Sequence, residues 1–313
     1  MKIDQRISLR AQAAAFENAM VKAADEGPLF VFLEVDSPGG DIAFVMRICE
    51  AILDSNCEVI CFINGGKYNG ATGSCAAIAL ACDKIYMAEN TIIGAATLMP
   101  ADKPNHQEVN EILNPGWTKR LNQAWKDYFS ILAQENDRSG LIAEAMVDKD
   151  IAVIEVYEGN LRKYIEPEKR QPMQNVTRTW SEKGSLLTLT SAEALQCGFA
   201  EKIVNSQKEL LRELTAEQAI VVSDEEIQQA ARTFKKVKLK FDRLRSSLDL
   251  KIKRVERTEN VPKAMNLLRE IRDDYKSLLQ LARRHPDLSL DVELLQEQVD
   301  FVERSYKSAK TGG

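Results

Sequence analysis

The chain has 313 residues, with 47 acidic and 42 basic side chains and a formal net charge of −5 at pH 7. This mildly acidic balance gives no indication of a protein that binds nucleic acid through its overall charge, and the length allows two domains or one large α/β domain with an appendage. Only two histidines are present, His106 and His285, and the six cysteines have no CxxC spacing, so histidine-based catalysis, a disulfide framework and a metal site are not indicated. No metal or organic cofactor is expected. The cysteines are instead expected to be buried reduced thiols: Cys49, Cys57, Cys61, Cys75, Cys82 and Cys197.

Membrane and export signals are also missing from the sequence. No segment approaches the roughly twenty consecutive apolar residues of a membrane span, and the N-terminus has no apolar signal-peptide core. The expected location is therefore cytoplasmic, with no direct membrane span, although a leader that had been removed would leave a similar start.

Helix and strand signals alternate through the first two hundred residues. Helices are expected at residues 8–24, 42–53, 75–81, 118–135, 139–147 and 191–196, and strands at residues 29–35, 58–63, 84–88 and 184–189. Residues 64–70 form a glycine-rich loop. The βαβα order predicts an α/β fold with a mainly parallel sheet whose two faces are both covered by helices.

The strand at residues 29–35 leads into Ser37-Pro38-Gly39-Gly40. Proline ends the strand and two glycines leave the backbone unobstructed, so that two N–H groups can point at one spot. Such a spot could stabilise the oxyanion of an acyl-transfer reaction. The alternative is an ordinary turn from strand to helix.

The character of the sequence changes at about residue 223. Apolar residues recur at steps of three and four from Ile227 to Val255, which predicts a coiled-coil seam of about four heptads. Two further helices are expected at residues 264–282 and 292–306, giving a three-helix bundle or a helical hairpin with an extra turn. The basic run within residues 235–257 favours a solvated helix face; a docking surface for an acidic partner is the alternative.

Several ordered motifs resemble the ClpP/crotonase superfamily, and within it the Ser-Lys peptidases of the NfeD and SppA types, which cut hydrophobic membrane-derived peptides. They are DSPGG at residues 36–40, ATGSCAAIALACDKI at 71–85, MAENTIIGA at 87–95, LAQENDR at 132–138 and LTLTSAEALQCG at 187–198. The resemblance implies a ClpP/crotonase-like peptidase domain over residues 1–215, followed by an all-α domain over residues 223–313. Because relatives in this superfamily form rings or dimers, the resemblance also implies a homo-oligomer.

The family's chemistry uses a serine at the start of the buried helix and a lysine on a later helix as general base, with the amine made neutral by burial. An ungapped count places Gly73 at the position of the serine and Arg120 at that of the lysine, and arginine stays protonated. Ser74 and Lys119 each lie one residue away, a helix rotation of about 100°. A glycine-rich loop one residue longer than in the NfeD type would restore Ser74. The candidate site is therefore Ser74 and Lys119, with Gly39 and Gly40 as the oxyanion hole.

Three functions follow from this pattern. The first is a serine peptidase homologue that is impaired, or a pseudoenzyme that binds a peptide or protein partner by strand addition next to the turn. The second is an active Ser-Lys peptidase, and the third is an oligomeric scaffold. A crotonase-like acyl-CoA enzyme would need a pair of acidic catalytic residues that is not found.

Individual residues also have simpler interpretations. Ser74 could cap its helix, and Cys75 is expected to be a structural thiol because no histidine is near. Lys119 and Arg120 could be solvated helix charges. Asp36 is expected to fix backbone N–H groups before the turn.

Overall fold

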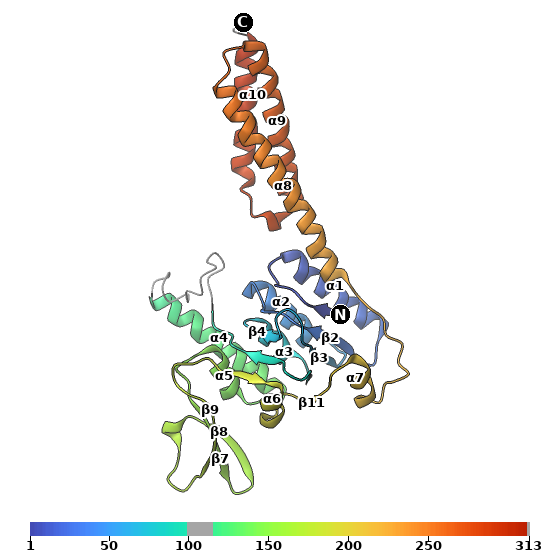
Figure 1. Cartoon of the computed structure of the whole chain (residues 1–313), viewed down its shortest axis with the longest axis vertical. Helices are drawn as coiled ribbons and strands as arrows, with labels where there is room; N and C mark the ends of the chain where they lie inside the picture. Colours follow the sequence, from blue (N-terminus) through green and yellow to red (C-terminus); the bar gives the residue numbers. More distant parts are fainter. Residues whose placement is uncertain (99–114, 312–313) are drawn as a thin grey trace. The chain divides into compact units, whose positions relative to one another are not determined.

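The computed structural model describes residues 1–98 and 115–311, and the chain separates into two compact units, Met1–Gln228 and Gln229–Gly313. His106 lies outside the described residues. The first unit is built on a five-stranded sheet (Figure 1). Its order is β1 (Lys2–Ile3), β2 (Val31–Val35), β3 (Val59–Ile63), β5 (Lys84–Met87) and β11 (Lys202–Ile203), and all neighbouring strands are parallel. The predicted parallel sheet is confirmed.

Helices cover both faces of this sheet, as the continuous apolar strands require. On one face, alternate residues of β3, Ile60 and Phe62, pack with Leu210 of α7 (Gln207–Glu213). Five other helices pack in succession along the chain: α1 (Arg10–Glu26) on α2 (Ile42–Leu53), α2 on α3 (Cys75–Ala81), α3 on α4 (Pro115–Glu135), and α4 on α5 (Gly140–Val147). Every residue of α3 is buried, which explains why this helix consists of small and aliphatic residues.

A second, small sheet holds the start of α3 in place. Its order is β10 (Thr188–Thr190), β6 (Ile92–Gly94) and β4 (Gly70–Thr72), with β10 antiparallel and β4 parallel to β6. The strand expected at residues 184–189 is thus shorter and lies later in the chain. The next helix, α6 (Ser191–Cys197), follows it directly, because the Thr190 side chain accepts the Glu193 N–H and caps the helix.

An antiparallel sheet that the sequence analysis missed follows α5. It has the order β8 (Leu161–Ile165), β7 (Val153–Glu158) and β9 (Val176–Ser181), and the short helix η2 (Pro167–Lys169) lies between β8 and β9. The β7–β8 loop consists of Gly159 and Asn160, and Gly159 has a φ of +64°. A two-residue Gly-Asn loop between β-rich runs is a recognised hairpin signal.

The second unit contains three helices that share one apolar cluster (Figure 1). They are α8 (Glu226–Glu256), which begins just before the unit boundary, α9 (Val261–Arg284) and α10 (Val292–Thr311), with η3 (Pro286–Leu288) between α9 and α10. Leu248, Ile271, Leu278 and Val302 form the buried centre of the cluster. A helical C-terminal region is therefore confirmed, whereas the coiled coil, the oligomer and the peptidase-domain boundaries stay predictions.

Candidate functional site

The turn after β2 approaches the start of α3 very closely. Ser37 pairs with Ala71 of β4: the Ser37 N–H donates to the Gly70 carbonyl over 2.8 Å, and the Thr72 N–H donates to the Ser37 carbonyl over 3.1 Å. Gly39 has a φ of +80°, and a Cβ at this position would lie 2.2 Å from Ser74 Oγ and 2.5 Å from the Cys75 nitrogen. The turn can meet the helix in this way only because residue 39 is glycine.

The Ser74 hydroxyl both accepts a hydrogen bond from the turn and donates one to it. It accepts the Gly40 N–H over 2.8 Å and donates to the Gly40 carbonyl oxygen at 3.2 Å. Ser74 is the N-cap residue of α3, yet its side chain makes no capping hydrogen bond, so the interpretation as a helix cap was wrong. The structure thus brings Ser74, Gly39 and Gly40 together. The Ser74 hydroxyl occupies the Gly40 N–H, a donor that could otherwise hold an oxyanion.

The rest of the turn is paired with the chain's own N-terminal segment. The Gly39 carbonyl accepts the Ile7 N–H over 2.9 Å, and the Asp41 N–H donates to the Ile7 carbonyl over 2.8 Å. Ser37 Oγ accepts the Gly39 N–H and donates to the Gln5 carbonyl. Sequence analysis did not predict this segment next to the turn; the apolar alternation of Ile7 and Leu9 was the available signal, and it is short.

Asp36 has the role expected from the sequence. Its buried carboxylate accepts the Gly70 N–H over 3.0 Å and the Tyr68 N–H over 3.2 Å. These bonds fix the glycine-rich loop directly before β4, and with it the position at which α3 begins.

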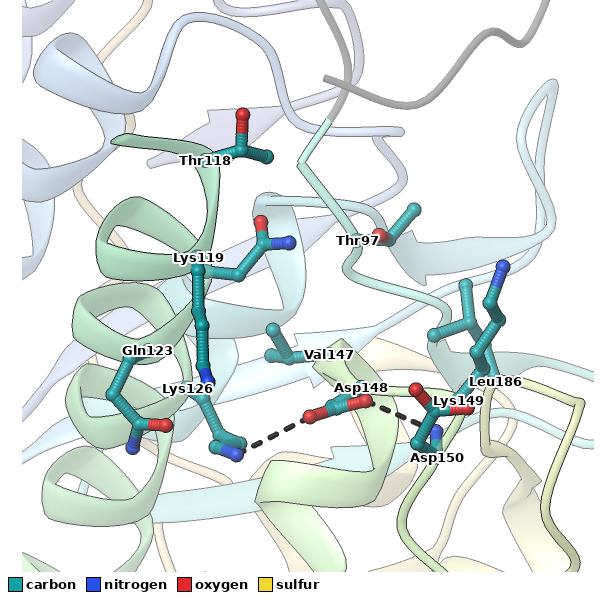
Figure 2. A pocket seen from close by; sticks show the side chains of 11 residues that line it. Thr97, Thr118, Lys119, Gln123, Lys126, Val147, Asp148, Lys149, Asp150 and Leu186 are labelled. Carbon is teal, nitrogen blue, oxygen red and sulfur yellow. Dashed lines mark hydrogen bonds and ion pairs between the residues drawn. The ribbon is translucent and has the colours of Figure 1, made fainter. Parts of the chain in front are cut away.

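Lys119 lies in a different environment. It is exposed on α4 and lines a pocket of about 390 Å³, together with Lys126, Asp148 and Asp150 (Figure 2). Lys126 forms an ion pair with Asp148 over 3.2 Å. Neither Ser74 nor the two glycines line this pocket, and within residues 1–98 and 115–311 no hydrogen bond joins Ser74 to Lys119. Arg120 is exposed on the same helix. The described structure does not bring the lysine to the serine.

Gly73, the serine position by ungapped count, is confined by the same turn. Its φ is +57°, and a Cβ there would lie 2.4 Å from the Pro38 carbonyl oxygen. Its N–H donates to the Gly94 carbonyl over 3.1 Å. This backbone therefore leaves no room for a side chain at residue 73.

Cys75, directly after Ser74, is fully buried, and burial raises the pKa of its thiol to about 12. A thiol with this pKa stays protonated at neutral pH and is a poor nucleophile. The expectation of a structural thiol is confirmed. Among the described residues, no group of three or more His, Cys, Asp or Glu side chains is placed to hold a metal ion.

The model of one protein family, described as the NfeD1b N-terminal domain, matches residues 7–171, which is more than half of the 313-residue chain. The chain belongs to this family. The NfeD part of the resemblance is confirmed. The SppA part receives no support.

Individual proteins are also similar to this chain. The membrane protein NfeD1b of Bacillus subtilis (strain 168) is 25% identical over 207 residues, which cover 66% of this chain. The chain spans only about two fifths of that relative, 39% of its length. Two solved structures of the 1510-N membrane-bound stomatin-specific protease are each 23% identical with a TM-score of 0.49: a serine-to-alanine mutant, covering 68% of this chain and 81% of its own, and a lysine-to-alanine mutant in complex with a substrate peptide, covering 67% and 76%.

The cytoplasmic location expected from the sequence was wrong. The curated relative is named a membrane protein, which points to membrane association. Across the described part of the chain, none of the helices is long and apolar enough to cross a bilayer.

Proposed function

We propose that this chain is a membrane-associated NfeD-type peptidase homologue that binds a peptide or protein partner without hydrolysing it. One observation carries the proposal: both hydrogen bonds of the Ser74 hydroxyl go to Gly40, while Lys119 is exposed beside another pocket. A serine nucleophile needs a general base within hydrogen-bond reach, and a lysine base needs burial to become neutral. Neither condition is met by this pair.

The partner would bind at the same turn. An extended peptide pairs with free backbone N–H and C=O groups at a sheet edge. The Gly39 carbonyl and the Asp41 N–H are already bonded to Ile7, and the Gly39 N–H is bonded to Ser37 Oγ. Among the residues that the structure describes, the N–H and C=O of Gly40 are held by a side chain alone, the Ser74 hydroxyl. Rotation of that side chain would release both groups to a peptide without any change in the sheet.

Labelling with a fluorophosphonate tests the missing hydrolysis. We expect no labelling of the full chain under conditions that label an active serine peptidase. Labelling that disappears in Ser74→Ala and persists in Ser206→Ala would overturn the proposal in favour of an active serine peptidase. Ser206 is a suitable control because it is an exposed helix cap far from α3 in the sequence.

Peptide binding tests the other half. Fluorescent hydrophobic peptides are expected to bind the full chain and to stay intact. Ser74→Ala should strengthen binding about thirtyfold, because two hydrogen bonds of about 1 kcal/mol each no longer compete for Gly40. Ser206→Ala should leave the affinity unchanged. No binding by the wild type, or an equal change in both variants, would contradict a peptide site at Gly40.

A further inference from the structure

The N-terminal two thirds of α8 carry a dense set of positive charges. Residues 231–245 contain seven lysines and arginines and one acidic residue, Asp242, and no acidic residue lies between Ile227 and Phe241. We define the α8 basic face as six exposed side chains of this stretch: Lys235, Lys236, Lys238, Lys240, Arg243 and Arg245. The net charge of the whole chain, −5, makes this local excess unusual for the molecule.

These charges are not neutralised within the fold. In the described ranges 1–98 and 115–311, none of the six side chains of the α8 basic face forms an ion pair. Further along the same helix the situation differs, because Lys251 pairs with Asp274 over 2.7 Å and with Glu270 over 3.4 Å. The positive charge of the α8 basic face is therefore available to an external anionic partner.

The four lysines of the α8 basic face lie outside the apolar cluster that α8 shares with α9 and α10, whereas Arg243 and Arg245 lie within the range of α8 that it covers. The α8 residues of the shared apolar cluster are Phe241, Leu244, Leu248, Ile252 and Val255, so the four lysines precede the cluster. Figure 1 shows α9 and α10 beside the C-terminal part of α8, with its N-terminal part continuing past them.

Two leucines on the outer side of α8 give a second feature. Leu239, between Lys238 and Lys240, is 51% exposed, and Leu250 is 57% exposed. They are eleven residues apart, about three helical turns, and therefore lie on the same side of the helix. Exposed leucine among lysines is typical of a helix at a lipid interface, where the charges meet anionic headgroups and the apolar side chain enters the acyl boundary.

We infer that the α8 basic face binds the surface of a bilayer that contains anionic phospholipids. The inference rests on the proposed membrane association and names the surface responsible for it. A nucleic acid fits less well, because Leu239 and Leu250 would gain nothing from a phosphate backbone, and none of the exposed residues on this face is an aromatic side chain for base stacking. An acidic protein partner also fits less well, because a charged surface would offer Leu239 and Leu250 no apolar environment.

Vesicle co-sedimentation of the full chain tests the inference. Vesicles of phosphatidylcholine with about 30 mol% phosphatidylglycerol should bind the protein, vesicles of phosphatidylcholine alone should not, and binding should fall as salt rises from about 0.05 to 0.5 M. Replacing Lys235, Lys236, Lys238 and Lys240 by glutamine should weaken binding roughly a hundredfold or more. Leu239→Gln should weaken it severalfold.

A matched control removes the same charge elsewhere in the unit. Lys263, Arg269, Arg284 and Arg304 are exposed on α9 and α10, and their replacement by glutamine should leave binding to within about twofold of its wild-type value once the small loss of overall charge is allowed for. Glutamine is a good helix former, so circular dichroism should show unchanged helicity in both variants.

Three results would overturn the inference. They are absence of vesicle binding by the wild type at low salt, an equal loss in the control variant, and tighter binding to a nucleic acid that the lysine variant alone abolishes. Fluorophosphonate labelling and peptide binding should be unchanged in the lysine variant, so failure of this inference and failure of the proposed function give different results.

Discussion

Gly39→Ala is the substitution that most directly probes the contact between the turn and α3. The new Cβ would lie 2.2 Å from Ser74 Oγ, 2.5 Å from the Cys75 nitrogen and 2.7 Å from the Ser74 nitrogen, against 3.4 Å or more for an ordinary contact. A left-handed φ costs a non-glycine residue about 1–2 kcal/mol, and overpacking of a tight site costs about 1–3 kcal/mol more. We therefore expect the free energy of unfolding to fall by about 3–4 kcal/mol.

Gly27→Ala is the matched control for backbone strain. Gly27 ends α1 with a φ of +60°, and no heavy atom lies within 4 Å of a Cβ at this position. Its replacement should cost only the conformational part, about 1 kcal/mol. The difference between the two variants, about 2 kcal/mol or more, then measures the close approach of the turn to α3.

Urea unfolding followed by tryptophan fluorescence measures this difference. All three tryptophans of the chain, Trp117, Trp125 and Trp180, precede the unit boundary at Gln228, so the signal reports the first unit alone. Combining Gly39→Ala with Ser74→Ala should restore less than half of the loss, because the two backbone nitrogens stay in the way. If Gly39→Ala costs no more than Gly27→Ala, the turn does not contact α3 as described, and the Ser74–Gly40 pairing fails with it.

Three further predictions concern the surroundings of the site. Arg138→Met should lower the free energy of unfolding by about 3–5 kcal/mol in the same assay, because the buried guanidinium donates to the carbonyls of Leu80, Cys82 and Asp83 at the end of α3; a loss below about 1 kcal/mol would refute this role. Gly73→Ser should lower the free energy of unfolding by about 3 kcal/mol and gain no fluorophosphonate labelling, since its Cβ meets the Pro38 carbonyl. Labelling of this variant would refute the helix register described for α3. Burial raises the pKa of the Cys75 thiol from 9.0 to about 12, so above pH 9 the unfolded state loses this proton first, and this thiol alone should lower the free energy of unfolding by about 1.4 kcal/mol per pH unit. Urea midpoints at rising pH should therefore fall less steeply in Cys75→Ala than in the wild type, and equal slopes would contradict the assignment.

The sequence predicted those elements in which a strong apolar pattern and tertiary burial agree. The helix expected at residues 42–53 is α2, and the helix expected at residues 75–81 is α3. The first carries apolar residues at helical spacing, and the second is a continuous run of small and aliphatic residues. The three C-terminal helices were likewise predicted, because Asn260-Val261-Pro262 and His285-Pro286-Asp287 interrupt an otherwise continuous periodic pattern.

The antiparallel sheet β8–β7–β9 was missed for a physical reason. Its strands mix apolar residues with polar and charged ones without strict alternation, and two of the charges, Glu155 and Arg178, are partly or wholly covered by tertiary contacts. Glu155 is buried because its carboxylate accepts the Trp180 indole N–H over 3.0 Å. A polar residue buried by a specific partner does not contribute to the apolar pattern from which a strand is recognised.

At the candidate site, sequence reasoning could predict the close approach but not the direction of the hydroxyl. One residue of helix register turns a side chain by about 100°, and the register of α3 is set by the loop before it, where Asn69 has a φ of +60° and Gly70 a φ of +142°. Those conformations depend on the bonds from Asp36 to Tyr68 and Gly70. No spacing rule contains this information, because the carboxylate and the loop are more than thirty residues apart.

The hydrogen bonds between Ser74 and Gly40 decide what hydrolysis at this turn would require. The Gly40 N–H holds the Ser74 hydroxyl in the resting structure, and the same N–H would have to hold the oxyanion in a reaction. The hydroxyl must therefore leave Gly40 before Gly40 can serve as a donor, which costs about 1 kcal/mol for each hydrogen bond lost. A substrate that displaced the hydroxyl would recover this cost, but proton transfer would still need a neutral amine within reach. Release of the Ser74 hydroxyl from Gly40 should consequently give no turnover by itself, and a gain of activity would also require a buried lysine beside α3.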